Sequence, residues 1–188
     1  VADDIALNLG APSVRIAAVP GKISVVGIEV PNRTVNMVSL REVIDSPEFG
    51  KSKSKTSFSV GRDIGGNCIV GNISKLPHML IAGTTGSGKS VCMNSIIISL
   101  LYKASPDDVK LIMVDPKMVE LSLYNVLEKH FLAKLESEEE SIITDVNRVV
   151  RTLKSLCIEM DNRYKLLQAA CVRSLKEYNE KFLNRELL

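Results

Sequence analysis

The sequence predicts an α/β fold with a mostly parallel sheet, preceded by a small β-rich segment. Two apolar runs, His78–Ala82 and Val109–Val114, have the length and composition of buried parallel strands. The segment between them, Val91–Lys103, has apolar residues around most of a helical surface, which predicts a helix buried between layers. A strand, a helix and a strand of these lengths predict a right-handed βαβ unit.

The chain before this unit predicts short elements separated by turn residues. Asp4–Leu9 reads as the end of a helix stopped at Gly10. Two β-hairpins and one short helix follow, because runs of strand-forming residues alternate with proline, glycine and asparagine. Their expected ranges are Val14–Val19 with Ile23–Val30 for the first hairpin, Leu40–Ile44 for a helix closed by Ser46-Pro47, and Thr56–Val60 with Asn67–Gly71 for the second hairpin.

The chain after the unit is predicted to be mainly helical. Met118–Leu127 has a helical pattern, and the glutamate-rich segment Ala133–Ser141 reads as surface. Asp145 can cap a long helix that runs to about Leu167, whose apolar residues recur every three to four positions. Packing across a sheet is the expectation for this helix, with a coiled coil as the alternative. A last helix is expected over Ser174–Leu183.

Directly after the run His78–Ala82 stands the motif G-x-x-x-x-G-K-[ST]. Its residues are Gly83, Thr84, Thr85, Gly86, Ser87, Gly88, Lys89 and Ser90, followed by Val91. This is the phosphate-binding P-loop, and the expected strand before it and helix after it supply the context that the motif needs. The glycines let backbone N–H groups approach phosphate oxygens at the N-terminus of the helix. The sequence therefore predicts that a nucleoside triphosphate and Mg²⁺ are bound here.

Each motif position has an expected role. Residues 83–91 would hold the nucleotide, Lys89 would act on the β- and γ-phosphates as the catalytic cation, and the Ser90 hydroxyl would ligate Mg²⁺. A P-loop also needs a carboxylate near the metal. Asp115 ends an apolar strand and is one candidate, either as a magnesium ligand or in a structural role towards the neighbouring loop or Lys117. Glu120 is a weaker candidate.

Composition limits the remaining possibilities. The net charge of +2 over 188 residues gives no overall basic field for nucleic acid, so any DNA contact would have to be local. The alternating run Lys51–Lys55 could contact phosphate, although a solvated loop is the more common outcome. Two of the four cysteines, Cys92 and Cys157, occupy apolar helical positions, which predicts buried free thiols in a reducing cytoplasm.

Several motifs, in order, resemble the FtsK/SpoIIIE family of double-stranded DNA translocases. The resemblance extends over nearly the whole chain and is much more specific than the P-loop alone. It is carried by Ala11–Ile16, Gly27–Asn32, Leu76–Val91, Val114–Leu121, Glu159–Tyr164 and Val172–Lys181.

The resemblance implies a homo-hexameric ring that pumps double-stranded DNA by ATP hydrolysis during chromosome segregation and cell division. Residues 1–38 would end a small alpha subdomain with a β-hairpin. Residues 39–188 would be the N-terminal part of a RecA-like ATPase domain, ending before its Walker B strand. Such a protein is expected in the cytoplasm, with any anchoring at the inner face of the membrane made by segments outside this sequence. The first residue is Val1 rather than methionine, which is also expected of a fragment.

Two other functions remain open from the sequence. One is a coupling ATPase of a conjugation or secretion system, although the Asp115-Pro116-Lys117 and Arg163-Tyr164 motifs favour chromosome translocation. The other is a nucleotide-binding module that does not hydrolyse ATP as an isolated fragment. The sequence shows no apolar strand that ends in Asp-Glu, the pair that commonly positions the attacking water, so this chain alone is expected to hydrolyse ATP weakly or not at all.

Overall fold

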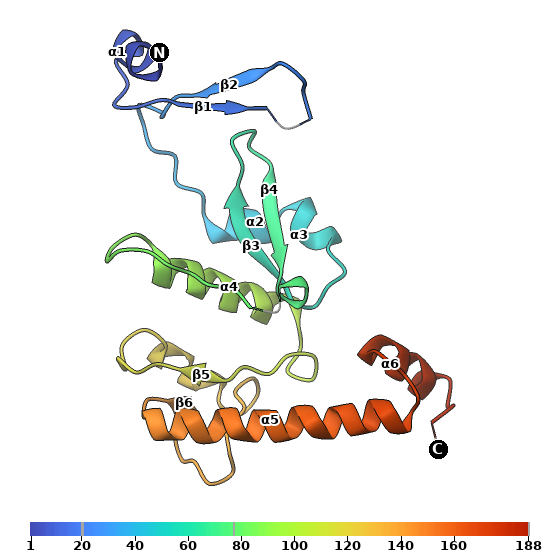
Figure 1. The fold of residues 1–188 in the computed structure, drawn as a ribbon. Coiled ribbons are helices and arrows are strands. Elements are labelled where there is room, and N and C mark those ends of the chain that lie inside the picture. Colours follow the sequence, from blue (N-terminus) through green and yellow to red (C-terminus); the bar gives the residue numbers. More distant parts are fainter. Residues whose placement is uncertain (20, 77, 188) are drawn as a thin grey trace.

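The computed structural model describes residues 1–19, 21–76 and 78–187 (Figure 1). Its elements, in chain order, are α1 (Ala2–Leu9), β1 (Arg15–Ala18), β2 (Val26–Glu29), α2 (Leu40–Ile44), α3 (Pro47–Lys51), β3 (Ser57–Arg62), β4 (Cys68–Asn72), the 3₁₀ helix η1 (Ile73–Lys75), α4 (Lys89–Lys103), β5 (Met113–Val114), the 3₁₀ helix η2 (Ser122–Leu127), β6 (Ile142–Ile143), α5 (Val146–Ala169) and α6 (Leu175–Leu183).

The N-terminal elements confirm the first hairpin and the helix before it. Gly10 ends α1 with a φ of 62°, a left-handed conformation that glycine adopts without a steric penalty. Strands β1 and β2 then pair antiparallel, with Arg15 opposite Glu29 and an ion pair of 3.5 Å between their side chains. From this hairpin an extended stretch leads to α2 (Figure 1).

The second hairpin is also confirmed, and it is joined to a pair of short helices. Ser46 closes α2 and also begins α3, because its hydroxyl accepts the Phe49 N–H while Pro47 takes the first helical position. Strands β3 and β4 pair antiparallel with an irregularity between Ser59 and Gly61. In the Lys51–Lys55 run, the serine hydroxyls bond Ser57 and Asn72 and Lys55 pairs with Asp108, as part of a structured loop.

Helix α4 lies between two small apolar clusters. On one side Ile96 and Leu100 pack with Phe58 of β3. On the other side the half-buried Met93 and Ile97 pack against a second cluster, whose buried members are Met113, Leu121, Leu132 and Ile142. Figure 1 shows α4 with the β3–β4 hairpin on one side and the β5–β6 layer on the other. The prediction of a helix buried between layers is confirmed.

The predicted mostly parallel sheet is wrong. The described residues form three separate two-stranded sheets: β1–β2 and β3–β4 are antiparallel, and only β5–β6 is parallel. The run His78–Ala82 belongs to none of them, and its Leu80 is 91 % exposed. The expected βαβ unit therefore does not form, because β5 pairs with β6 instead. An apolar run becomes a strand only where a neighbouring strand pairs with its backbone N–H and C=O groups.

Other elements depart from expectation after β5. The segment Met118–Leu127 is a turn followed by η2 rather than an α-helix. Asp145 does cap α5 by accepting the Arg148 N–H, and Ser174 caps α6 in the same way. However, α5 does not pack across a sheet, since many of its apolar side chains are exposed: Val146, Val150, Leu153, Leu156, Ile158, Met160, Tyr164 and Leu166.

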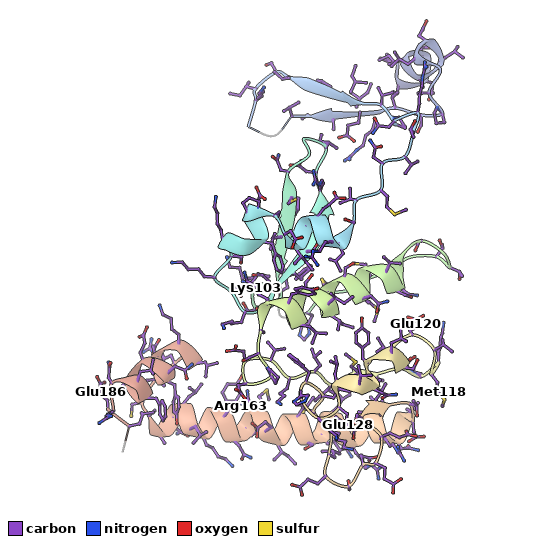
Figure 2. The ribbon with its side chains drawn as sticks, turned by 180° about the vertical axis from the view of Figure 1, so that it is seen from behind. Lys103, Met118, Glu120, Glu128, Arg163 and Glu186 are labelled. Atoms are coloured by element: carbon purple, nitrogen blue, oxygen red, sulfur yellow. The ribbon has the colours of Figure 1, made fainter. Side chains whose placement is uncertain are left out.

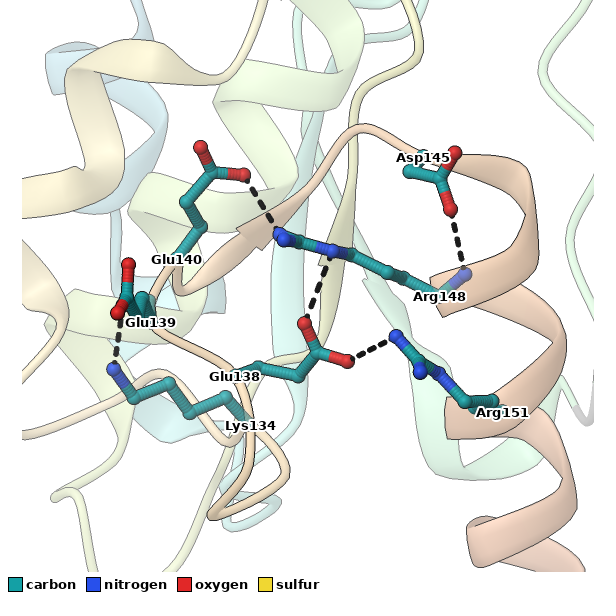
Figure 3. A network of polar contacts seen from close by, with 7 residues as sticks. All are labelled: Lys134, Glu138, Glu139, Glu140, Asp145, Arg148 and Arg151. Carbon is teal, nitrogen blue, oxygen red and sulfur yellow. Dashed lines mark hydrogen bonds and ion pairs between the residues drawn. The ribbon is translucent and has the colours of Figure 1, made fainter.

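Two burial predictions are also wrong. Cys92 and Cys157 are free, but both are exposed rather than buried, because their sides of α4 and α5 have no packing partner among the described residues. Within the predicted surface segment Ala133–Ser141, Glu138 is buried. Its carboxylate lies between the guanidinium groups of Arg148 and Arg151 (Figure 3), so charge pairing makes its burial tolerable. Within the described ranges, no helix is long and apolar enough to cross a membrane.

Candidate nucleotide-binding site

Three glycines shape the loop before α4. Gly86 and Gly88 have φ angles of 81° and 91°, which side chains strongly disfavour. A Cβ on Gly83 would lie 2.2 Å from the Ser87 hydroxyl oxygen, so a larger residue there would force the Ser87 side chain to move. The motif glycines therefore let the backbone form a tight turn directly before the helix.

The loop ends at an uncapped helix N-terminus. Gly88 is the residue before α4 and has no side chain to accept the first-turn N–H groups. The N–H groups of Lys89, Ser90 and Val91 therefore have no intrahelical acceptors, and no acidic residue lies in this first turn. Free N–H groups and the positive end of the helix dipole favour an anion at this place.

A cavity of about 290 Å³ opens over this turn. Two segments far apart in the sequence line it: the loop with the start of α4, and the turn that follows β5. The lining residues are Thr84, Thr85, Gly86, Gly88, Lys89, Ser90, Val91, Lys117 and Glu120. All but two of these belong to residues 83–91, which the sequence predicted to hold the nucleotide. Lys117 and Glu120 add one positive and one negative side chain, and Lys117 had not been assigned a site role from the sequence.

Glu120 is joined directly to the motif. The Ser90 hydroxyl donates a hydrogen bond of 3.1 Å to the Glu120 carboxylate. Figure 2 shows Glu120 and Met118 on the turn beside the N-terminal end of α4. The weaker of the two sequence candidates is thus the carboxylate that reaches the loop. Its only sequence signal was its position five residues beyond the end of a strand.

Asp115 holds the turn on which Glu120 lies. Its side chain is buried, with 5 % of the residue exposed. One carboxylate oxygen accepts the N–H groups of Lys117 at 3.2 Å and Met118 at 3.1 Å; the other accepts those of Glu120 and Leu121, each at 2.9 Å. These backbone bonds, led by that of Leu121, hold the pKa of Asp115 below its usual value. They explain why this turn is not helical, and they match the structural role that the sequence left open.

The side chains in the cavity fit magnesium together with a nucleotide. Mg²⁺ in such sites takes one or two protein oxygens and completes its shell with phosphate and water. Ser90 and Glu120 supply two oxygen donors on adjacent segments, while Lys89 and Lys117 supply positive charge for phosphate. The assignment of Asp115 as a magnesium ligand stays a prediction, and both its oxygens are occupied by backbone N–H groups.

The loop, its three glycines and the helix after it define the class of P-loop nucleotide-binding proteins. Comparison with known families is more specific. Residues 39–187 match the FtsK/SpoIIIE family, and residues 1–32 match the FtsK alpha domain. The chain belongs to the FtsK/SpoIIIE family, as its motifs predicted.

Individual relatives agree with this assignment. Proteins named DNA translocase FtsK are 52 % identical in Clostridium tetani, over 96 % of this chain, and 50 % identical in Clostridium acetobutylicum, over all of it. The chain spans 23 % of the length of each. A solved structure of the conjugation coupling protein TcpA of pCW3, in its monomer form with ATPgS, has a TM-score of 0.60 and 25 % identity. That match covers all of this chain and 47 % of TcpA.

Proposed function

We propose that this chain is the ATP-binding part of a hexameric, ATP-driven double-stranded DNA translocase that acts in chromosome segregation and cell division. The observation that carries the proposal is the P-loop cavity at the start of α4, in a chain about half identical to DNA translocases along its whole length. In this proposal residues 1–38 end the alpha subdomain and residues 39–188 begin the ATPase domain. The whole protein works in the cytoplasm, with any membrane anchor outside this sequence.

The roles of the site residues follow from their positions. Gly83–Ser90 and Val91 surround the phosphates with N–H donors, and Lys89 neutralises the β- and γ-phosphates and is the catalytic cation. The Ser90 hydroxyl, which donates to Glu120 in this structure, would be a ligand of Mg²⁺ in the nucleotide complex. Magnesium, when bound, would neutralise the negative charge that develops on the phosphate oxygens during hydrolysis. Asp115 remains a candidate for the metal only if its backbone bonds open.

Replacing Lys89 tests the nucleotide site. We expect Lys89→Ala to weaken binding of a fluorescent, non-hydrolysable ATP analogue about 10- to 100-fold, since it removes charge-assisted hydrogen bonds to phosphate. Lys165→Ala, an exposed lysine on α5, is the matched control and should bind like the parent chain. Unchanged affinity in Lys89→Ala, with an unchanged circular dichroism spectrum, would remove the nucleotide from this site.

Hydrolysis tests the motor part of the proposal. The described part of the cavity holds one carboxylate, Glu120, which is needed beside Mg²⁺ and so leaves none to orient the attacking water. We therefore expect the chain as given to bind ATP with little turnover, whereas the intact protein should show ATPase activity that long duplex DNA stimulates and Lys89→Ala abolishes. DNA-stimulated hydrolysis that survives Lys89→Ala would contradict the assignment.

A second candidate is a conjugation coupling ATPase, and the likeness to TcpA favours it. Identity to TcpA is 25 %, against about 50 % to the DNA translocases, so chromosome translocation has the stronger support. The intact protein separates the two: stimulation by long duplex DNA alone supports the translocase. A requirement for a secreted or relaxase polypeptide supports the coupling protein.

A further inference from the structure

We infer that Glu120 is a magnesium-dependent component of the nucleotide site, and that Asp115 is the positioning residue that holds it there. The carboxylate of Glu120 accepts the hydrogen bond of the Ser90 hydroxyl. In the nucleotide complex the same carboxylate would supply negative charge to the divalent cation. The inference rests on the proposed function, because it assigns a role within the same ATP site.

The first support is the geometry of the turn. Asp115 directs the N–H groups of residues 117, 118, 120 and 121 inwards through both carboxylate oxygens. Met118 has a φ of 60°, a left-handed conformation that is unfavourable for a residue with a side chain. The bonds to Asp115 hold the chain in this conformation, and the resulting reversal brings Glu120 back over the P-loop.

The second support is the docking of this turn on α4. Glu120 meets Ser90 at 3.1 Å, and one helical turn further along α4 the Tyr124 hydroxyl donates to the Asn94 side chain at 2.9 Å. Ser90 and Asn94 are four residues apart and so lie on one face of the helix. The Tyr124 hydrogen bond only fastens the turn to α4. Glu120 places a negative charge on the same face of α4, at the N-terminal end where phosphate is expected.

The third support is the charge of the cavity. Glu120 is the one acidic side chain among its lining residues, beside the cations Lys89 and Lys117. A carboxylate beside the phosphates is unfavourable without a metal, because like charges repel. With magnesium bound, the same carboxylate becomes favourable. Glu120 therefore makes tight nucleotide binding conditional on the cation.

The test measures the affinity of the 1–188 chain for a non-hydrolysable ATP analogue in excess Mg²⁺ and in EDTA. In Glu120→Gln we expect the gain in affinity from Mg²⁺ to fall about tenfold or more, as is usual when a partner of a metal site is removed. Affinity in EDTA should rise about two- to fivefold, because the repulsive charge is gone. A structural role would lower affinity in both conditions.

Two control variants distinguish the effect of the Glu120 charge from the effect of packing the turn against α4. Tyr124→Phe removes the structural tie alone and should leave the magnesium gain within about twofold of the parent. Glu136→Gln removes an exposed charge outside the cavity and should change nothing. An equal loss in Tyr124→Phe and Glu120→Gln, or no change in Glu120→Gln, overturns the inference.

Asp115→Asn tests the positioning role. It should reduce the magnesium gain in the same direction as Glu120→Gln, and the double variant should lose no more than Glu120→Gln alone, because both changes act on one carboxylate. Additive losses would show that Asp115 acts independently of Glu120. Nucleotide binding in EDTA depends on the P-loop and not on the metal. If the proposed function were wrong, Lys89→Ala would leave the affinity in EDTA unchanged, which is a different outcome from a failure of the Glu120 inference.

Discussion

At the residue scale, the side chain of Ser99 links helix α4 to strand β3 by a hydrogen bond. It lies on α4 with no exposed surface, donates to the Ser95 carbonyl at 2.6 Å and accepts the N–H of Ser59 in β3 at 3.0 Å. That N–H lies next to the irregularity in the β3–β4 pairing, where the regular hydrogen-bond pattern is interrupted. The serine hydroxyl thus satisfies a buried strand donor that the hairpin itself leaves free.

Replacing Ser99 by alanine should therefore lower the free energy of unfolding by about 1–3 kcal/mol, because the Ser59 N–H would stay buried without an acceptor. Ser95→Ala on the same helix is the matched control. Its hydroxyl bonds only the Val91 carbonyl near the surface, so we expect a change within about 0.5 kcal/mol. Urea unfolding followed by circular dichroism measures both. Equal losses of unfolding free energy in the two variants would show that the Ser99–Ser59 hydrogen bond does not stabilise the fold.

Asp115 gives the turn after β5 a pH dependence. Its pKa is lowered in the folded chain, chiefly by the backbone N–H of Leu121, from a reference value of 3.8. Because the pKa is lower in the folded than in the unfolded chain, the carboxylate stabilises the fold fully at pH values above its unfolded-state pKa. This contribution is lost as the pH falls through the folded-state pKa. Asp115→Asn removes the titration.

We expect the parent chain to exceed Asp115→Asn in thermal stability at pH 7, with the difference shrinking on acidification below about pH 4. Melting temperatures across pH 2.5 to 7 measure this, and Glu136→Gln serves as a control whose difference from the parent stays flat. A parent–variant gap that widens in acid would mean that Asp115 does not stabilise the fold as a carboxylate.

At the element scale, one buried carboxylate fastens a loop to a helix. The Glu138 side chain is 6 % exposed and meets Arg151 at 2.8 Å and Arg148 at 3.1 Å, both from the first turns of α5 (Figure 3). Glu140 meets Arg148 at the same distance of 3.1 Å, but its side chain is 60 % exposed. The two glutamates differ mainly in burial, which makes them a matched pair.

Glu138→Gln should cost about 1–2 kcal/mol of unfolding free energy, an intermediate value because the two arginines keep partial access to water. Glu140→Gln should cost less than about 0.5 kcal/mol, since exposed ion pairs contribute little. The salt dependence gives an independent reading: the Glu138 effect should persist in about 0.5 M NaCl, while any Glu140 effect should vanish. Equal costs for both glutamates would contradict a special role of burial.

Element by element, local signals carried most of the correct predictions. Helix ends were readable because Gly10, Asp145 and Ser174 act on their own neighbours in sequence. The helical prediction for Met118–Leu127 was wrong because Asp115, a residue before the segment, captures its backbone N–H groups. The burial of Glu138 depends on two arginines from the next helix, and no local pattern announces such a partner.

At the scale of the whole molecule, the chain is open. Its accessible surface is 14552 Å², against about 8,900 Å² for a compact monomer of this mass. Much of the excess is apolar, and it includes a stripe on α5 formed by exposed Val150, Leu153, Leu156, Met160 and Tyr164. Exposed apolar surface on this scale favours association.

We therefore expect the 1–188 chain to self-associate in a concentration-dependent way, measured by sedimentation velocity. The double variant Leu153→Glu with Met160→Glu should weaken association about tenfold or more, since it places two charges in the stripe without disturbing a buried core. Asn162→Glu with Gln168→Glu adds the same charge at exposed polar positions of α5 and is the control. Association that is equal in both variants would place the contact elsewhere.

The sequence by itself determined the phosphate-binding loop, the helix behind it, the caps of the later helices and membership of the family. These features depend on residue types at fixed short spacings, so the local chain specifies them. Only the tertiary structure decided which carboxylate reaches the loop, since Asp115 and Glu120 differ by how a turn folds back on α4. It also decided that His78–Ala82 stays unpaired, because strand pairing depends on which distant segments lie beside it.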